Sequence, residues 1–191
     1  IRSLGNLSMP TTQLRPWKYT DVSHIDFDDF SPHKLKIDIK NSNDSIKFGN
    51  EYSETIEKNF GRLIPSTEGI FIAANMSLFE DPIVVDISDR EIVEEPIVIN
   101  INSDHPEASI VCPRIFINIG QQSEATIVLR YSSGSESLIV SGVMEVLADQ
   151  GSNLRILIDN SWGANTEDYS TIRSKISKDA DVRIGALATG A

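Results

Sequence analysis

One pattern recurs three times between Ile115 and Ala186, as Thr126-Ile127-Val128, Leu154-Arg155-Ile156 and Val182-Arg183-Ile184. Successive copies are 28 residues apart. Self-similarity at a fixed period is the sequence signature of a solenoid, in which each repeat forms one coil and neighbouring coils stack. This stretch therefore predicts a repeat architecture for at least three coils.

The residue types within the repeat predict strands. The outer two positions of each triplet are mostly apolar, and the middle position becomes charged, which is the period-2 alternation of a strand with one buried face. We therefore expect one face to point inward and the other outward in every copy. The inward columns are Thr126, Leu154 and Val182, and Val128, Ile156 and Ile184.

A second series has the same spacing. Phe116, Met144 and Ile172 are also 28 residues apart and are predicted to face inward, with Ile117, Glu145 and Arg173 facing outward. Stacked strands lie about 4.8 Å apart. The register therefore predicts an ion pair between Glu145 and Arg173 on adjacent coils.

These patterns predict a mainly β protein, a right-handed parallel β-helix of about 28 residues per coil with a small N-terminal α/β region. Ile87 and Val98 lie 28 residues before Ile115 and Thr126, so we expect about four coils. The predicted division is an N-terminal region at 1–82 and the β-helix at 83–191. The alternative is an antiparallel sandwich, because short strands every 8–12 residues fit that fold too. A sandwich, however, has no reason to hold register over three copies.

Two helices are predicted in the N-terminal region. The first, at 51–64, has an apolar stripe, and the second begins at an N-cap supplied by Ser66 or Thr67 and is stopped by Pro82. Each is expected to span about four turns. A strand at 35–39 and a turn at 41–45 precede them, and strands at 83–87 and 97–101 follow. The stripe of the first helix consists of Tyr52, Ile56, Phe60, Leu63 and Ile64.

Charge and composition exclude some classes of function. The formal net charge is −11, and all of it lies after residue 64, because residues 1–64 are neutral. Such an acidic body repels phosphate backbones, so we expect no nucleic-acid partner. No apolar run approaches the length needed to cross a bilayer, and no signal peptide is evident. The single Cys112 rules out an internal disulfide, and we expect a cytoplasmic protein.

The chain ends directly after the strand-like run 182–187. Solenoids need capped ends, because the terminal coil otherwise exposes its apolar interior. We therefore expect either a fragment of a longer protein, truncated at its C-terminal end, or an exposed coil that a partner covers.

No familiar catalytic motif is present, and we assign no catalytic, cofactor-binding or metal-binding residue. His24, His33 and His105 are interpreted as surface residues rather than metal ligands. Cys112 is interpreted as a small buried hydrophobe, with a nucleophile or cluster ligand as the less favoured alternative. A β-helix enzyme acting on polysaccharide is the alternative function, but the aligned columns stack no two of the carboxylates that glycoside hydrolysis requires.

Several segments resemble the SufB/SufD family, and its SufD branch in particular. Pro10-Thr11 followed by Trp17-Lys18-Tyr19-Thr20 is similar to the SufD signature P-T-x-x-x-E-x-W-[KR]-Y-T. The signature's Glu is Arg15 here, and the Asp-Gly that the family usually has after its second helix is Asp81-Pro82. Further resemblance lies in Glu95-Pro96-Ile97-Val98-Ile99, in 124–129 and in 153–187.

The resemblance implies a non-enzymatic scaffold subunit of the Suf iron–sulfur cluster assembly complex. Its implied partners are a SufC-type ABC ATPase and a SufB-like protein. A homodimer is a further alternative. The family's ATPase-docking and cluster-associated positions belong to later segments, so no site residue is carried onto this chain. We expect no cofactor bound by this fragment, and the full complex is implied to handle the iron–sulfur cluster. A plain β-solenoid interaction module is the remaining alternative.

Overall fold

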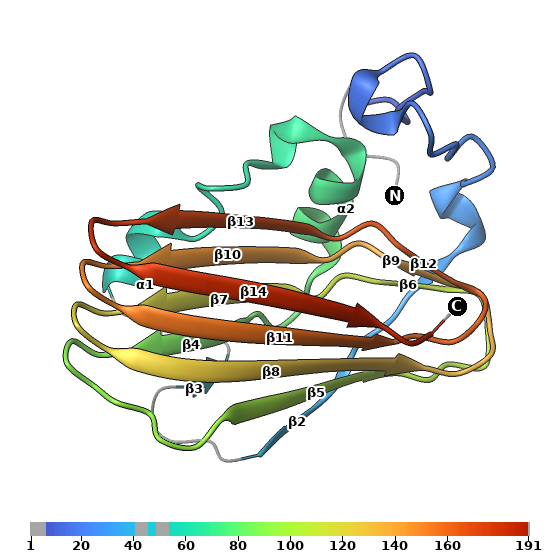
Figure 1. Cartoon of the computed structure of the whole chain (residues 1–191). Helices are drawn as coiled ribbons and strands as arrows, with labels where there is room; N and C mark the ends of the chain where they lie inside the picture. The colour runs from blue at the N-terminus through green and yellow to red at the C-terminus, as the bar shows by residue number, and fades with distance from the viewer. Residues whose placement is uncertain (1–6, 41–45, 49–53, 191) are drawn as a thin grey trace.

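The chain folds as a parallel β-solenoid of about four coils, with helices on one side (Figure 1). The computed structural model describes residues 7–40, 46–48 and 54–190. The predicted mainly β solenoid is thus confirmed, and the antiparallel sandwich is excluded because successive coils pair in parallel.

Each coil contributes up to three strands. The first coil holds β4 (Ile83–Ile87), β5 (Ile97–Ser103) and β6 (Ser109–Val111), and the second holds β7 (Arg114–Ile119), β8 (Glu124–Ser133) and β9 (Leu138–Val140). The third holds β10 (Val143–Ala148), β11 (Asn153–Ser161) and β12 (Thr166–Asp168), and the fourth holds β13 (Thr171–Ile176) and β14 (Asp181–Ala188).

Equivalent strands stack into three sheets, to which the N-terminal region adds β1 (Ser31–Pro32), β2 (Lys36–Lys40) and β3 (Ile46–Phe48). We call β1-β6-β9-β12 the short sheet, β3-β4-β7-β10-β13 the covered sheet and β2-β5-β8-β11-β14 the bare sheet. Strands β2 and β3 pair antiparallel to β5 and β4. They therefore close the first coil with strands that do not continue the solenoid.

The register differs from the predicted one by a single residue over part of the chain. Met144 lies between Ile115 and Ile172, which are 29 and 28 residues away, so Phe116 is not in its column. Likewise Leu154 pairs with Ala125 rather than Thr126, and Ile156 with Ile127 rather than Val128. A one-residue shift reverses the face of a side chain. Phe116, Thr126 and Val128 therefore point outward, contrary to the prediction.

The first coil is longer than predicted as well. Ile83 pairs with Ile115 and Ile97 with Ile127, which are separations of 32 and 30 residues. The predicted alignments of Ile87 with Ile115 and of Val98 with Thr126 are therefore wrong, although both strands exist where they were expected.

The interior of the solenoid is filled by aliphatic side chains in stacked columns. In the first three coils, alternate residues of the long strands face inward and are almost fully buried, as in the column Ile97, Ile127, Ile156. The solenoid is held together by this burial, since each buried aliphatic side chain contributes about 1.5–3 kcal/mol.

Among the described residues, two short α-helices lie outside the solenoid, α1 (Glu54–Asn59) and α2 (Ile70–Leu78). Both are shorter than the four turns predicted. A 3₁₀ turn at Ser66–Glu68 precedes α2, and the N-cap is Gly69 rather than Ser66 or Thr67. Gly61 has a φ of 72°, which ends the first helical segment early. The expected Tyr52 and the turn at 41–45 lie outside the described residues.

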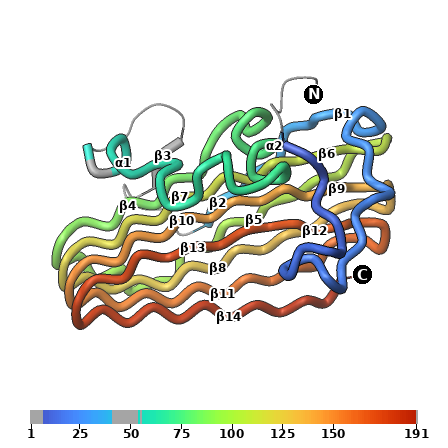
Figure 2. The backbone as a smooth tube through the Cα atoms, turned by 90° about the horizontal axis from the view of Figure 1, so that it is seen from above, coloured from blue at the N-terminus to red at the C-terminus, as the bar shows by residue number. Residues whose placement is uncertain are grey.

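The three sheets differ in what covers their outer faces. Ile56 of α1 lies on Val84 and Phe116 of the covered sheet. Phe71 of α2 and Phe27 of the N-terminal segment belong to the cluster that lies over the outer face of the short sheet, together with Ile110, Cys112 and Ile139. Neither helix lies against the bare sheet (Figures 1 and 2).

Candidate functional site

The last coil exposes residues whose equivalents are buried one coil earlier. Ile172 is 41% exposed whereas its register partner Met144 is 4% exposed, and Ile184 is 39% exposed whereas Ile156 is 3% exposed. The two side chains of each pair belong to the same interior column. The difference arises because, within the described part of the chain, β13 and β14 have a neighbouring strand on one side only.

This end of the solenoid is therefore an apolar surface bordered by free strand edges. A pocket of about 310 Å³ opens there between the coils, and Met144, Ile158, Ile172 and Ala186 are among its lining residues. An edge strand offers unpaired backbone N–H and C=O groups to any strand that arrives. The arrangement can accept another β element, whether a further coil or a strand of a partner, and we take it as the candidate interaction site.

A buried ion pair joins the helical region to the covered sheet. Nη2 of Arg114 lies 2.8 Å from Oε2 of Glu145, with both side chains fully buried. The Glu145 carboxylate also accepts hydrogen bonds from the backbone N–H groups of Gly61, Leu63 and Ile64 at 2.8, 2.9 and 3.0 Å. Desolvation lowers the pKa of the Arg114 guanidinium, which the neighbouring Glu145 charge opposes. This carboxylate therefore fixes the segment between the two helices.

The predicted pair between Glu145 and Arg173 is wrong, although the two residues are register neighbours. Arg173 instead forms two hydrogen bonds of 2.7 Å with Glu68 and one of 2.5 Å with the carbonyl of Leu63. The Glu68 hydrogen bond raises the pKa of Arg173. Both arginines thus bind the helical region to the solenoid.

Sequence reasoning missed the Arg114–Glu145 pair. Glu145 stands alone among apolar residues in Val143-Met144-Glu145-Val146, which was the available signal that the charge has a buried partner. Asn75 of α2 completes the network, because it accepts from Arg114 at 3.1 Å and donates to the carbonyls of Pro113 and Ser141. The network fastens α2 and the segment 61–64 to the covered sheet, and Nε of Arg114 is buried there without a hydrogen-bond partner among the described residues.

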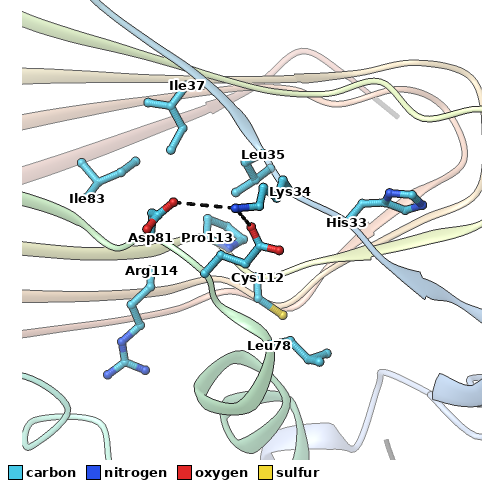
Figure 3. Close-up of a pocket in the computed structure, with 11 residues that line it drawn as sticks. His33, Lys34, Leu35, Ile37, Leu78, Asp81, Ile83, Cys112, Pro113 and Arg114 are labelled. Carbon is cyan, nitrogen blue, oxygen red and sulfur yellow. Dashed lines mark ion pairs between the residues drawn. The ribbon is translucent and has the colours of Figure 1, made fainter. Parts of the chain in front are cut away.

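Cys112 lines a small pocket of about 60 Å³ between the short sheet, α2 and the strand β2 (Figure 3). Its sulfur lies beside Leu78, and Lys34 forms ion pairs with Glu80 and Asp81 across the pocket. Burial raises the pKa of the Cys112 thiol to about 12. Burial therefore favours the neutral thiol, which is a weaker nucleophile than the thiolate.

The histidines lie at the surface in two places. Nε2 of His24 is 3.0 Å from Oε1 of Glu167. His33 and His105, far apart in sequence, stack with ring centroids 4.2 Å apart, and Nε2 of His33 is 2.9 Å from Glu107. Among residues 7–40, 46–48 and 54–190, no group of three or more His, Cys, Asp or Glu side chains is arranged to hold a metal ion.

Acidic side chains near the turns serve local structure. Asp149 accepts from the N–H of Gln150, and Asp168 accepts from Trp162 Nε1 at 3.1 Å and from Ser170. These contacts hold the turns between strands, so nothing about them favours the polysaccharide-acting alternative.

The Trp17-Lys18-Tyr19-Thr20 segment divides into an anchor and an exposed part. Trp17 stacks on Phe71 of α2 at 5.6 Å and lies 6.1 Å from Tyr169, which follows β12. Tyr19 is 90% exposed. Trp17 therefore anchors the N-terminal segment to α2, whereas the ring of Tyr19 is exposed.

Comparison with known families gives one match. Residues 99–191, just under half of the chain, match the family model described as SUF system FeS cluster assembly, SufBD core domain. The matched residues run from β5 to the last coil, so they include the candidate interaction site. This match supports the SufB/SufD family.

Searches of curated proteins and of solved structures gave no match. Within the described part of the chain, neither helix is long and apolar enough to cross a membrane.

Proposed function

We propose that this chain is a non-enzymatic scaffold subunit of a Suf iron–sulfur cluster assembly complex. The observation that carries the proposal is that the residues matching the SufBD core domain form most of the solenoid and its exposed last coil. In this proposal the cluster is cargo of the complex, and no residue of this chain is assigned to hold it. A cytoplasmic location accompanies the proposal.

The proposed mechanism is assembly through the last coil. A partner with strand edges of its own would pair with β13 and β14 and cover Ile172, Ile176 and Ile184. Pairing would satisfy backbone groups that otherwise template aggregation. The partners proposed are a SufB-like protein at this surface and a SufC-type ABC ATPase within the same complex, and a second copy of the chain would compete with the SufB-like protein.

Within the family we propose the SufD branch. Support comes from Trp17-Lys18-Tyr19-Thr20, which lies outside the matched residues but within the segment that Trp17 anchors to α2.

Co-purification tests the proposal. The tagged chain is co-expressed with the SufB-like protein and SufC-type ATPase of the same organism, and the products are analysed by size-exclusion chromatography and mass spectrometry. We expect a stable complex that Ile184→Asp disrupts and that Lys178→Glu, at an exposed turn, leaves intact. Isolation of the chain without either protein would contradict the proposed role.

A further inference from the structure

The bare sheet carries a second apolar feature, distinct from the last coil. Val98, Val128 and Leu157 occupy one register column on its outer face, and we call them the apolar stripe. Leu157 is 46% exposed, and the other two are partly exposed. The next residue in the column is Gly185, so Leu157 has no side chain beside it on that strand.

Arginines flank the apolar stripe on both sides. Arg130 follows Val128 by two residues on β8, and Arg155 precedes Leu157 by two residues on β11, so all four face outward. Two residues along a strand span about 6.6 Å, which places the arginines about 13 Å apart across the stripe.

Neither arginine forms a hydrogen bond or ion pair among the residues that the structure describes, although the acidic Asp159 is the register neighbour of Arg130 on β11. Arg155 lies next to Arg183 in the register, which places like charges on adjacent strands and is unfavourable. Arg183 is compensated by Asp181 at 2.8 Å, but Arg155 is not. Unpaired positive charge is notable here because the chain as a whole carries a net charge of −11.

We propose that the bare sheet binds an acidic amphipathic α-helix of a partner protein along the apolar stripe. A helix rises about 5.4 Å per turn, close to the roughly 4.8 Å between stacked strands, so one apolar residue per turn meets each rung of the stripe. A helix about 10–12 Å wide fits between the two arginines. Carboxylates on its flanks pair with Arg130 and Arg155, since arginine is favoured at such contacts. The proposal does not depend on the family assignment.

Two designed probes test the charge argument. Both are fluorescent 15-residue peptides, stapled as helices on the outer face, with one leucine per turn on the inner face. The acidic peptide has glutamate on both flanks, and the basic peptide has lysine there. We expect the acidic peptide to bind the intact chain about tenfold more tightly or better by fluorescence anisotropy. Non-specific attraction to a chain of charge −11 would give the opposite order.

Substitutions locate the binding surface. Leu157→Asp and the pair Arg130→Glu/Arg155→Glu each reduce affinity for the acidic peptide about tenfold, and the arginine variant now prefers the basic peptide. The matched control, Lys175→Glu/Lys178→Glu, changes the same charge away from the bare sheet and leaves the preference unchanged. Circular dichroism confirms that each variant is folded. If Leu157→Asp does not fold, the Arg130→Glu/Arg155→Glu variant alone shows whether the acidic peptide binds at this surface.

Four results would overturn the proposal. The first is equal or tighter binding of the basic peptide, and the second is no binding of either peptide. The third is binding of the acidic peptide that none of these substitutions alters. A dimer in solution that Leu157→Asp abolishes would assign the face to a second copy of the chain instead.

Discussion

Arg114 and Glu145 lie on adjacent strands of the covered sheet and form an ion pair, 2.8 Å long, from which solvent is excluded. The pair sits beneath the aromatic rings of Phe60 and Phe79, which lie 4.9 and 5.9 Å from the guanidinium carbon. Since Glu145 also binds three backbone N–H groups of the segment 61–64, the pair determines where the helical region rests on the solenoid.

Glu145→Gln should destabilise the protein by about 3–5 kcal/mol, because it keeps the side-chain shape but leaves the Arg114 charge buried without a partner. Chemical denaturation with urea measures the effect.

The double variant Arg114→Met/Glu145→Gln is the control. It removes both charges, so its loss of stability should be smaller than that of Glu145→Gln alone. A double variant that is less stable than the single one would show that the charge of Arg114 is not the cause.

Exposure of the last coil gives a matched comparison. Ile156→Asp buries a charge in the closed interior and should cost about 4 kcal/mol or more. Ile184→Asp, one coil further in the same column, should cost about 1 kcal/mol or less because its side chain already meets solvent. Thermal denaturation of both variants checks the order, and equal losses would mean that the last coil is covered in solution.

The period in the sequence identified the solenoid because strand positions repeat at nearly equal intervals. It misplaced the inward columns because the coils differ in length. Strands β7 and β8 pair with β10 and β11 at an offset of 29 residues, whereas β10 and β11 pair with β13 and β14 at an offset of 28. Thr126 fitted the assumed interval of 28 but faces outward, because one extra residue in a coil exchanges the two faces of a strand.

The buried network that attaches the helices to the covered sheet could not be predicted from the sequence, for a different reason. Arg114, Glu145 and Asn75 come from separate elements, and their contacts depend on how α2 rests on the solenoid. Sequence periodicity reports which face of a strand is buried, but it does not report what covers that face.

Trp17 and Tyr19 should respond differently to substitution. Trp17→Ala removes the stacking on Phe71 and should release the N-terminal segment, at a cost of about 1–2 kcal/mol. Tyr19→Ala should leave stability within about 0.5 kcal/mol, because that ring is exposed. Hydrogen exchange of residues 14–30 distinguishes them, and unchanged protection in Trp17→Ala would contradict the assignment of Trp17 as the anchor.

The turns that follow the covered sheet share a left-handed residue. It lies three positions after β4, β7, β10 and β13 and is filled by Arg90, Gln122, Gly151 and Asp179, with φ between 55° and 70°. Only Gly adopts this conformation freely. Gly151→Ala should therefore cost about 1–2 kcal/mol in unfolding free energy.

The control for this turn is Gln122→Gly, which places the permissive residue at the equivalent position of another coil. It should leave stability unchanged or raise it slightly, as measured by urea denaturation. A loss as large as that of Gly151→Ala would argue against backbone strain as the cause.

Cys112 should make stability depend on alkaline pH. Burial raises the pKa of its thiol from 9.0 to about 12, so folding favours the neutral form. This contribution is fully present below pH 9 and is lost as the pH rises towards 12, because the unfolded thiol ionises first. Wild type should therefore lose more unfolding free energy between pH 8 and pH 10 than Cys112→Val. Native protein at pH 8 should also react slowly with iodoacetamide and rapidly once unfolded. Fast labelling of the native thiol would instead identify Cys112 as an accessible, reactive group.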